Sequence, residues 1–486
     1  MLEVCRNKIV TEINQSNYVA VMADEITDVS SKFQMVVVLR YVHEGSPVER
    51  FLAFINPEKH DAESLTHSIR SVLDPLLEEN CNKLIAQAYD GAAVMSGRHA
   101  SVYTRIREKY PLAYFVHCYA HQLNLIMSQA VSQNTQVRIF FSIMDDIVNF
   151  FSNSPQRLDI LTEVVGKRIP RAVQTPWNFK SSAVNIIYEY RTSLIECMQQ
   201  IQEQFSSAKA INQASAIERL LHDKVFLFWL NIFHNIMPHV DILYNQLQTR
   251  ITDPVVIKSA IDTFENCINN VRKDIKSVIK RGEELFKFES ESAPKRMRVS
   301  EESLRASALE VCDVMIQTAK TRFEYSGHLL ASTLFFSDHF DKYSKTFPDD
   351  VLKTTVAAYP VFEVERLRTE LTLIYMRPDF REINGAVAFL NMIRGNNLEQ
   401  TFKETIKLLE IIITIPMSTA ETERCFSTLK RVKNFLRNSV CVDRLSALSM
   451  LSIENTLIKN DINFNEKVIE MFASTKQCRI DLVFKK

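Results

Sequence analysis

The chain has 486 residues, of which 46% are hydrophobic and 24% are charged, a balance typical of folded globular domains. Its length allows about three structural units, each large enough to bury a core. Basic and acidic residues number 58 each, which excludes a global positive field for nucleic acid, and no apolar run reaches the ~18 residues that cross a membrane. DNA contact would therefore depend on local patches, and we expect no membrane association.

The first 133 residues are predicted to alternate strands with helices. Apolar, β-rich runs bounded by turn residues indicate strands at 18–23, 33–42, 48–55, 83–89 and 113–118. Helical spacing indicates helices at 1–15, at 61–79, from Gly91 to about Lys109, and from His121 onward. The order β-β-β-α-β-α-β-α begins with a meander of three antiparallel strands.

From about residue 135 to 395 the apolar residues have helical spacing almost throughout, and prolines mark the expected boundaries between helices. We therefore predict an α/β fold with a large all-α insertion. Residues 1–133 form the first part of the core, residues 134–395 the all-helical insertion domain, and residues 396–486 the last core helices together with a C-terminal region.

A late helix is predicted to begin after Pro416. The segment Ser418–Glu421 fits a capping box, with Ser418 as the N-cap and Glu421 at the third helical position. The apolar positions that predict its buried face are Phe426, Leu429, Val432, Phe435 and Leu436. At about 100° per residue, Glu423 lies about 60° from Phe426 and falls on this face, whereas Glu421, about 140° away, should face outward.

Three acidic residues suggest a metal site: Asp24 ends the first predicted strand, Asp90 ends the fourth, and Glu423 lies on the inward face of the late helix. In an RNase H-like mixed sheet the first and fourth strands are neighbours, so the two aspartates would reach one ion. Carboxylate oxygens suit Mg²⁺ or Mn²⁺, and two such ions support in-line phosphoryl transfer, the chemistry of DNA cleavage and joining. Structural alternatives stay open, because aspartate after a strand commonly starts a turn and Glu423 can pair with Arg424 or Lys430.

Four motifs resemble those of the hAT superfamily of DNA transposases, most of all its animal branch, which includes zinc-finger MYM-type and BED-type host proteins derived from transposons. They are MADEITDVS (22–30), YDGAAVMSG (89–97), VHCYAHQLNL (116–125) and IPMSTAETERCFSTLKRVKNFLRNSV (415–440). The resemblance implies an RNase H-like sheet interrupted by a helical domain, with Asp24, Asp90 and Glu423 as catalytic residues and as ligands of Mg²⁺ or Mn²⁺. Val94 departs from the family, which usually has a polar residue there.

By the same resemblance, Cys118 and His121 form a CxxH motif that supports the active site. Two ligands are too few for a zinc site, so the alternative is a packed cysteine beside a hydrogen-bonded histidine. The nine cysteines of the chain include no CxxC pair, which predicts free thiols in a reducing compartment and no zinc finger in this chain.

The resemblance assigns DNA binding to Trp177 and Arg424. Trp177 falls on an Arg-Trp motif of the helical insertion, where the ring can stack on a base flipped out near the cleavage site. Pro176 replaces the usual arginine of this motif, and a tryptophan buried in the core is an equal alternative.

Residues 396–486 resemble the hAT C-terminal dimerisation region, which implies self-association as a homodimer or higher oligomer. Its apolar stripe, formed by Val442, Leu445, Leu448 and Leu451, could equally pack within its own chain. Within the polar segment 289–302, the run PKRMRV resembles a nuclear-import signal, although a solvated loop also explains it. We expect a nuclear protein.

Two functions stay open at this point. One is a transposase-type enzyme that cleaves DNA and transfers strands, which the intact acidic triad favours. The other is a domesticated, non-catalytic nuclear protein that dimerises and regulates. Two features favour this second function and predict weak DNA binding: the zero net charge, and the short segment before Asp24, which is expected to leave no room for a zinc-binding DNA-binding domain.

Overall fold

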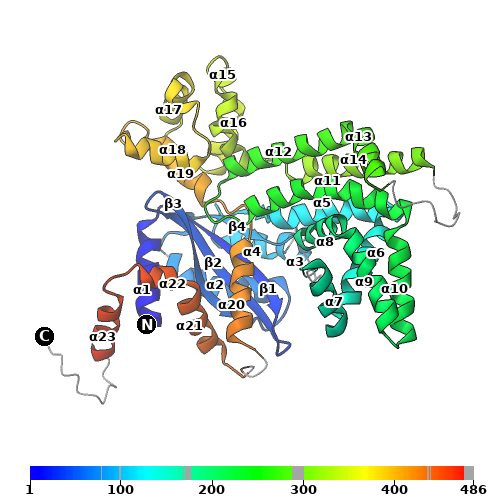
Figure 1. Ribbon diagram of the computed structural model, residues 1–486. Helices are drawn as coiled ribbons and strands as arrows, with labels where there is room; N and C mark the ends of the chain where they lie inside the picture. Colours follow the sequence, from blue (N-terminus) through cyan, green and yellow to red (C-terminus); the bar gives the residue numbers. More distant parts are fainter. Residues whose placement is uncertain are drawn as a thin grey trace. The chain divides into compact units, whose positions relative to one another are not determined.

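The structure is a computed structural model that describes residues 1–77, 79–97, 100–167, 169, 177–286, 300–434, 437 and 439–474 (Figure 1). The chain divides into two compact units. Unit 1 comprises Met1–His121, Leu247–Lys258 and Tyr325–Lys486, and unit 2 comprises Gln122–Gln246 and Ser259–Glu324. Unit 1 is therefore assembled from three separate stretches of sequence.

Five strands form one mixed sheet in unit 1, in the order β3-β2-β1-β4-β5. β1 (Val19–Thr27) pairs antiparallel with β2 (Phe33–His43), and β2 pairs antiparallel with β3 (Ser46–Ile55). β4 (Leu84–Tyr89) runs parallel to β1, and β5 (Tyr114–His117) runs parallel to β4. The predicted meander and the adjacency of the first and fourth strands are confirmed.

Strand β1 is longer than predicted, because β2 continues to pair with it as far as Thr27. Asp24 therefore lies inside β1, and the prediction that the strand ends there is wrong. The parallel pairing with β4 stops earlier, where Met22 stands opposite Ala88. Two residues beyond this last pair lie Asp24, which is still within β1, and Asp90, which directly follows β4.

The helices of unit 1 come from both ends of the chain. The first group is α1 (Leu2–Gln15), α2 (Ala62–Leu77), α3 (Ala93–Ser96) and α4 (Val102–Lys109). The last group is α19 (Lys403–Thr414), α20 (Ala420–Val432), α21 (Val442–Ile453), α22 (Asn455–Lys459) and α23 (Phe464–Ser474). Helix α19 packs against β2, β3 and β4, α20 against β1 and β2, and α21 against β3. The sheet is therefore completed by helices that all begin after residue 400.

Residues 325–395 also belong to unit 1, although the sequence places them in the helical insertion. Their helices are η3 (Gly327–Phe335), η4 (Ser337–His339), α15 (Phe340–Tyr343), α16 (Asp349–Ala358), α17 (Val364–Met376), η5 (Pro378–Phe380) and α18 (Ala386–Gly395). They share one apolar core with α19, in which Leu371, Phe389 and Leu408 are fully buried. Helical periodicity cannot separate these helices from the insertion, because it carries no information about which core a helix joins.

Unit 2 is helical in every regular element that the structure describes. Its helices are α6 (Thr135–Ser152), α7 (Pro155–Val165), α8 (Trp177–Glu189), α9 (Arg191–Gln204), α10 (Ala208–Leu221), α13 (Ile275–Phe286) and α14 (Glu301–Arg322), with most of α5 (Tyr119–Gln133), α11 (Lys224–Leu247) and α12 (Pro254–Lys273). Local signals set these bounds: α7 begins with Ser154 capping the backbone N–H of Arg157 and ends at Gly166 in the left-handed region. Among the described residues, no helix combines the length and the apolar character that crossing a membrane requires.

Candidate functional site

Asp24 and Asp90 stand together where the parallel strands end. The Asp24 carboxylate accepts hydrogen bonds from the backbone N–H of Glu25 at 2.8 Å and from the Thr422 hydroxyl at 3.2 Å. The pKa of Asp24 is raised to about 7, first by burial and then by the negative charges of Asp90 and Glu423, against the lowering effect of these hydrogen bonds. Asp90 and Glu423, from two distant segments, thus both act electrostatically on Asp24.

Asp90 directly follows β4 and is half-buried. Its carboxylate accepts the backbone N–H of Ala92 at 3.2 Å, which is the turn-forming bond that the structural alternative requires. This bond occupies one oxygen of the carboxylate. A turn role and a metal role are therefore compatible in Asp90.

The predicted burial of Phe426 and Leu429 in α20 is confirmed, but the predicted placement of the two glutamates of this helix is wrong. Glu421 is buried, with 2% of its surface exposed, whereas Glu423 is exposed. The buried side of the helix is centred on Cys425 and Leu429, because the sheet covers one side and residues 247–250 cover another. Phe426 is buried at the border of this covered arc. Glu423 lies outside the covered arc, yet surrounding protein raises its pKa through desolvation.

The predicted capping box is also absent. Helix α20 begins after Thr419, whose side chain makes no capping bond, and the Ser418 hydroxyl instead donates to the carbonyl of Leu247 at 2.6 Å. The Glu421 carboxylate forms two hydrogen bonds of 2.7 Å with the Arg250 guanidinium. Tertiary partners have taken both groups that a capping box would use.

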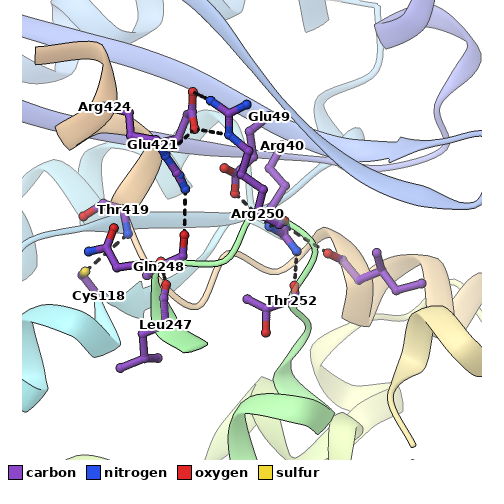
Figure 2. Close-up of polar contacts among 12 residues, drawn as sticks. Arg40, Glu49, Cys118, Leu247, Gln248, Arg250, Thr252, Thr419, Glu421 and Arg424 are labelled. Carbon is purple, nitrogen blue, oxygen red and sulfur yellow. Dashed lines mark hydrogen bonds and ion pairs between the residues drawn. The ribbon is translucent and has the colours of Figure 1, made fainter. Parts of the chain in front are cut away.

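Glu423 and Arg424 are both engaged by residues just after α11. The side chain of Gln248 forms a hydrogen bond with Glu423, which counteracts the desolvation that raises the pKa of this carboxyl. Arg424 donates to the carbonyl of Gln248 at 2.8 Å and pairs with Glu421 at 3.1 Å (Figure 2). Within the described parts of the chain, no three acidic, histidine or cysteine side chains are close enough together to hold a metal ion. The three acids are neighbours without forming a closed ligand set.

Cys118 fixes the segment that precedes α20. Its sulfur is buried and accepts the backbone N–H of Thr419 at 3.3 Å and that of His121. The backbone N–H of Tyr119 donates to the carbonyl of Met417 at 2.9 Å. Burial raises the pKa of the Cys118 thiol, so the group is a neutral packing and hydrogen-bonding residue. The CxxH segment therefore anchors the start of the helix that carries Glu423.

Several predicted features fall partly or wholly outside the described residues. Helix α8 begins at Trp177, but the side chain of Trp177 is outside the description, as are Phe435, Leu436 and the basic run at 294–299. The C-terminal stripe is described in full. Leu445 is buried, Leu448 is 40% exposed, and the Ser446 hydroxyl pairs with both backbone groups of Phe54 in β3.

Arg40 and Arg250 were not predicted as residues of the site. Arg40 lies in the apolar strand β2 and is only 2% exposed, which makes it one of the largest fully buried side chains described. A charge within the run FQMVVVLRYV is the signal that sequence reasoning could have used, because a buried charge requires partners. Arg250 offers no such signal, since it lies in a polar connection between helices.

Comparisons with known proteins agree with this architecture. Residues 2–100 match the ZMYM1/FAM200 RNase-like domain, and residues 389–457 match the hAT family C-terminal dimerisation region. The chain is similar to the "52 kDa repressor of the inhibitor of the protein kinase" of Homo sapiens, with 22% identity over 549 residues, 99% of this chain and 68% of that protein. The Mus musculus protein of the same name is 22% identical over 527 residues, 95% of this chain and 66% of that protein. The chain thus spans about two thirds of these relatives. Its N-terminal part is thus similar to an RNase-like domain of the ZMYM1/FAM200 type, and its C-terminal part to the hAT family C-terminal dimerisation region.

Proposed function

We propose that this chain has an RNase H-like core whose acids Asp24, Asp90 and Glu423 bind Mg²⁺ or Mn²⁺ for DNA strand cleavage and transfer. The observation that carries the proposal is the raised pKa of Asp24, to which the charges of Asp90 and Glu423 both contribute. Shifts of this kind, produced by burial and by like charges together, are concentrated at functional sites. The strand order, with β1 beside β4, and the match to an RNase-like domain support the same assignment.

The chemistry of the donors fits a divalent ion. Carboxylate oxygens are preferred by Mg²⁺ and Mn²⁺, and Asp24 in β1 and Asp90 directly after the neighbouring strand β4 offer them. When bound, such ions would activate the attacking water or 3′-hydroxyl and stabilise the leaving oxygen. The residues of the chain would hold the ions, and Thr422 would orient the Asp24 carboxylate through its hydrogen bond.

A non-catalytic, nuclear regulatory protein is the second candidate function. Arg424, expected to contact DNA, is instead occupied by Glu421 and by the carbonyl of Gln248. The relatives are named as a repressor, and the match to the dimerisation region supports self-association in either function. Under this second function, the acids would be retained without metal-dependent activity.

Nicking of supercoiled plasmid DNA with Mn²⁺ separates the two functions. We expect the wild-type chain to nick DNA and the Asp90→Asn variant to lose at least about a hundredfold in rate, because one metal ligand is gone. Asp443→Asn, which changes an exposed aspartate of α21, is the matched control and should retain the wild-type rate. Equal rates for wild type and Asp90→Asn would refute the metal site, and no nicking by any variant would favour the regulatory function.

Self-association can be tested at Leu448, which is exposed on α21. A charge introduced by Leu448→Glu should weaken the dimer at least about tenfold if this leucine is buried between two copies. Leu373→Glu in α17, where the leucine is 43% exposed, is the control and should leave association unchanged. Light scattering over a concentration series measures both, and a monomeric wild type at every concentration would contradict self-association.

A further inference from the structure

A short connection in unit 1 lies against the helix that carries Glu423. Residues 247–253, which we call the strap, join the end of α11 to the start of α12. Arg40 of β2 holds the strap in place, because its guanidinium donates to the carbonyls of Arg250, at 3.3 Å, and of Thr252. The same guanidinium pairs with Glu49 at 2.8 Å (Figure 2). It also donates to the carbonyl of Ile413 at 3.1 Å. The strap is therefore fixed to the sheet by a buried charge.

The strap in turn sets the start of α20. Leu247 accepts the hydroxyl of Ser418, and Arg250 binds both oxygens of Glu421, the buried acid of the first turn. Figure 2 shows Arg250 and Arg424 converging on Glu421. A buried carboxylate held by two guanidinium groups resists rotation of the helix, because rotation would leave a buried charge unpaired. The strap thus controls which way the residues of the first turn face.

Glu423, in the same turn, is itself bound to the strap through the side chain of Gln248. A carboxylate held by an amide must give up that hydrogen bond before its oxygen can enter a metal site. This competition agrees with the arrangement of the acids: Asp90 and Glu423 act electrostatically on Asp24, but among the described residues the acids form no closed ligand set.

We propose that the strap is a latch on the metal site, a conclusion that rests on the proposed function above. Arg250 acts as a positioning residue that fixes the rotation of α20 through Glu421. The side-chain amide of Gln248 keeps the carboxylate of Glu423 hydrogen-bonded to the strap until a metal ion replaces the amide as the partner of this carboxylate. The two residues therefore have opposite effects: loss of Gln248 frees the third ligand, and loss of Arg250 misplaces it.

Direct Mn²⁺ binding, followed by the electron paramagnetic resonance signal of the free ion, tests the latch without any activity measurement. We expect Gln248→Ala to bind Mn²⁺ about 3- to 10-fold more tightly than wild type. Gln213→Ala, an exposed glutamine of α10, is the matched control and should not change binding. Arg250→Met should bind at least about threefold more weakly, and Arg250→Lys should recover part of the loss. Thermal unfolding without metal verifies that each variant is folded.

The outcomes separate the latch from the site on which it acts. If wild type binds Mn²⁺ and Asp90→Asn does not, the metal site stands. If, in addition, Gln248→Ala binds Mn²⁺ no more tightly than Gln213→Ala does, the latch is wrong but the metal site is not. If neither wild type nor Gln248→Ala binds Mn²⁺, or if Asp90→Asn binds as well as wild type, the proposed metal site is wrong and the latch falls with it.

Discussion

Asn in place of Asp24 is expected to stabilise the metal-free protein at pH 8 by about 2 kcal/mol. The pKa of Asp24 rises from its ordinary value of 3.8 to about 7 in the folded chain, because of burial and the charges of Asp90 and Glu423. A carboxyl with a raised pKa contributes stability below pH 3.8, and this contribution is lost as the pH rises through about 7. The full shift corresponds to about 4 kcal/mol, and partial solvent screening reduces it to about half.

Urea unfolding in the presence of a chelator, at intervals between pH 4 and pH 8, measures this effect. The difference in unfolding free energy between Asp24→Asn and wild type should grow between pH 4 and pH 7 and then stay constant. Asp443→Asn serves as the control, since an exposed aspartate should give no such trend. Parallel curves for Asp24→Asn and wild type would show that Asp24 titrates normally and would remove the main support for the site.

The second large effect is expected at Lys433, which forms a buried ion pair with Asp28. The Lys433 ammonium lies 2.5 Å from the Asp28 carboxylate, with side-chain exposures of 3% and 0%. Lys433→Met keeps the apolar stem but leaves the buried Asp28 unpaired, so we expect a loss of about 3–5 kcal/mol in unfolding free energy. Because the pair connects the turn after β1 with the end of α20, the loss should appear in unfolding of unit 1.

A matched ion pair on the surface provides the comparison. Arg368 and Asp349 lie 3.1 Å apart with side-chain exposures of 45% and 52%, so Arg368→Met should cost less than about 1 kcal/mol. The double variant Asp28→Asn with Lys433→Met should recover part of the loss, because it removes the unpaired charge. Similar costs for Lys433→Met and Arg368→Met in chemical unfolding would contradict the burial argument.

The Lys433 pair also has a defined pH dependence. Burial alone would raise the pKa of Asp28, but hydrogen bonds from Lys433, Ser30 and the Lys32 backbone bring it down to about 2. A lowered pKa gives stability that is present above the ordinary value of 3.8 and is lost as the pH falls through about 2. The loss of unfolding free energy caused by Lys433→Met should therefore become smaller as the pH falls toward about 2. The effect of Asp24→Asn, in contrast, should grow as the pH rises toward about 7.

Much of the fold follows from local patterns in the sequence. Apolar runs and turn residues predicted the five strands and their chain order, and helical spacing predicted the helical unit. Both signals are local, because alternation and periodicity are set by which face of an element is buried. The placement of Asp24 in β1 and of Asp90 directly after the neighbouring strand β4 followed from the order of the strands.

The orientation of α20 and the existence of the strap were decided by tertiary structure. Helical arithmetic gives the angle between Glu421 and Glu423 but not which arc of the helix the rest of the protein covers. That arc depends on Arg250, which is 171 residues away from Glu421 in sequence and lies in a polar connection with no periodic signal. Local patterns in the sequence were sufficient to place Asp24 with the first strand and Asp90 next to the fourth. Only the packing of distant segments decided which glutamate is buried and which is exposed, because a side chain's burial is a property of what covers it.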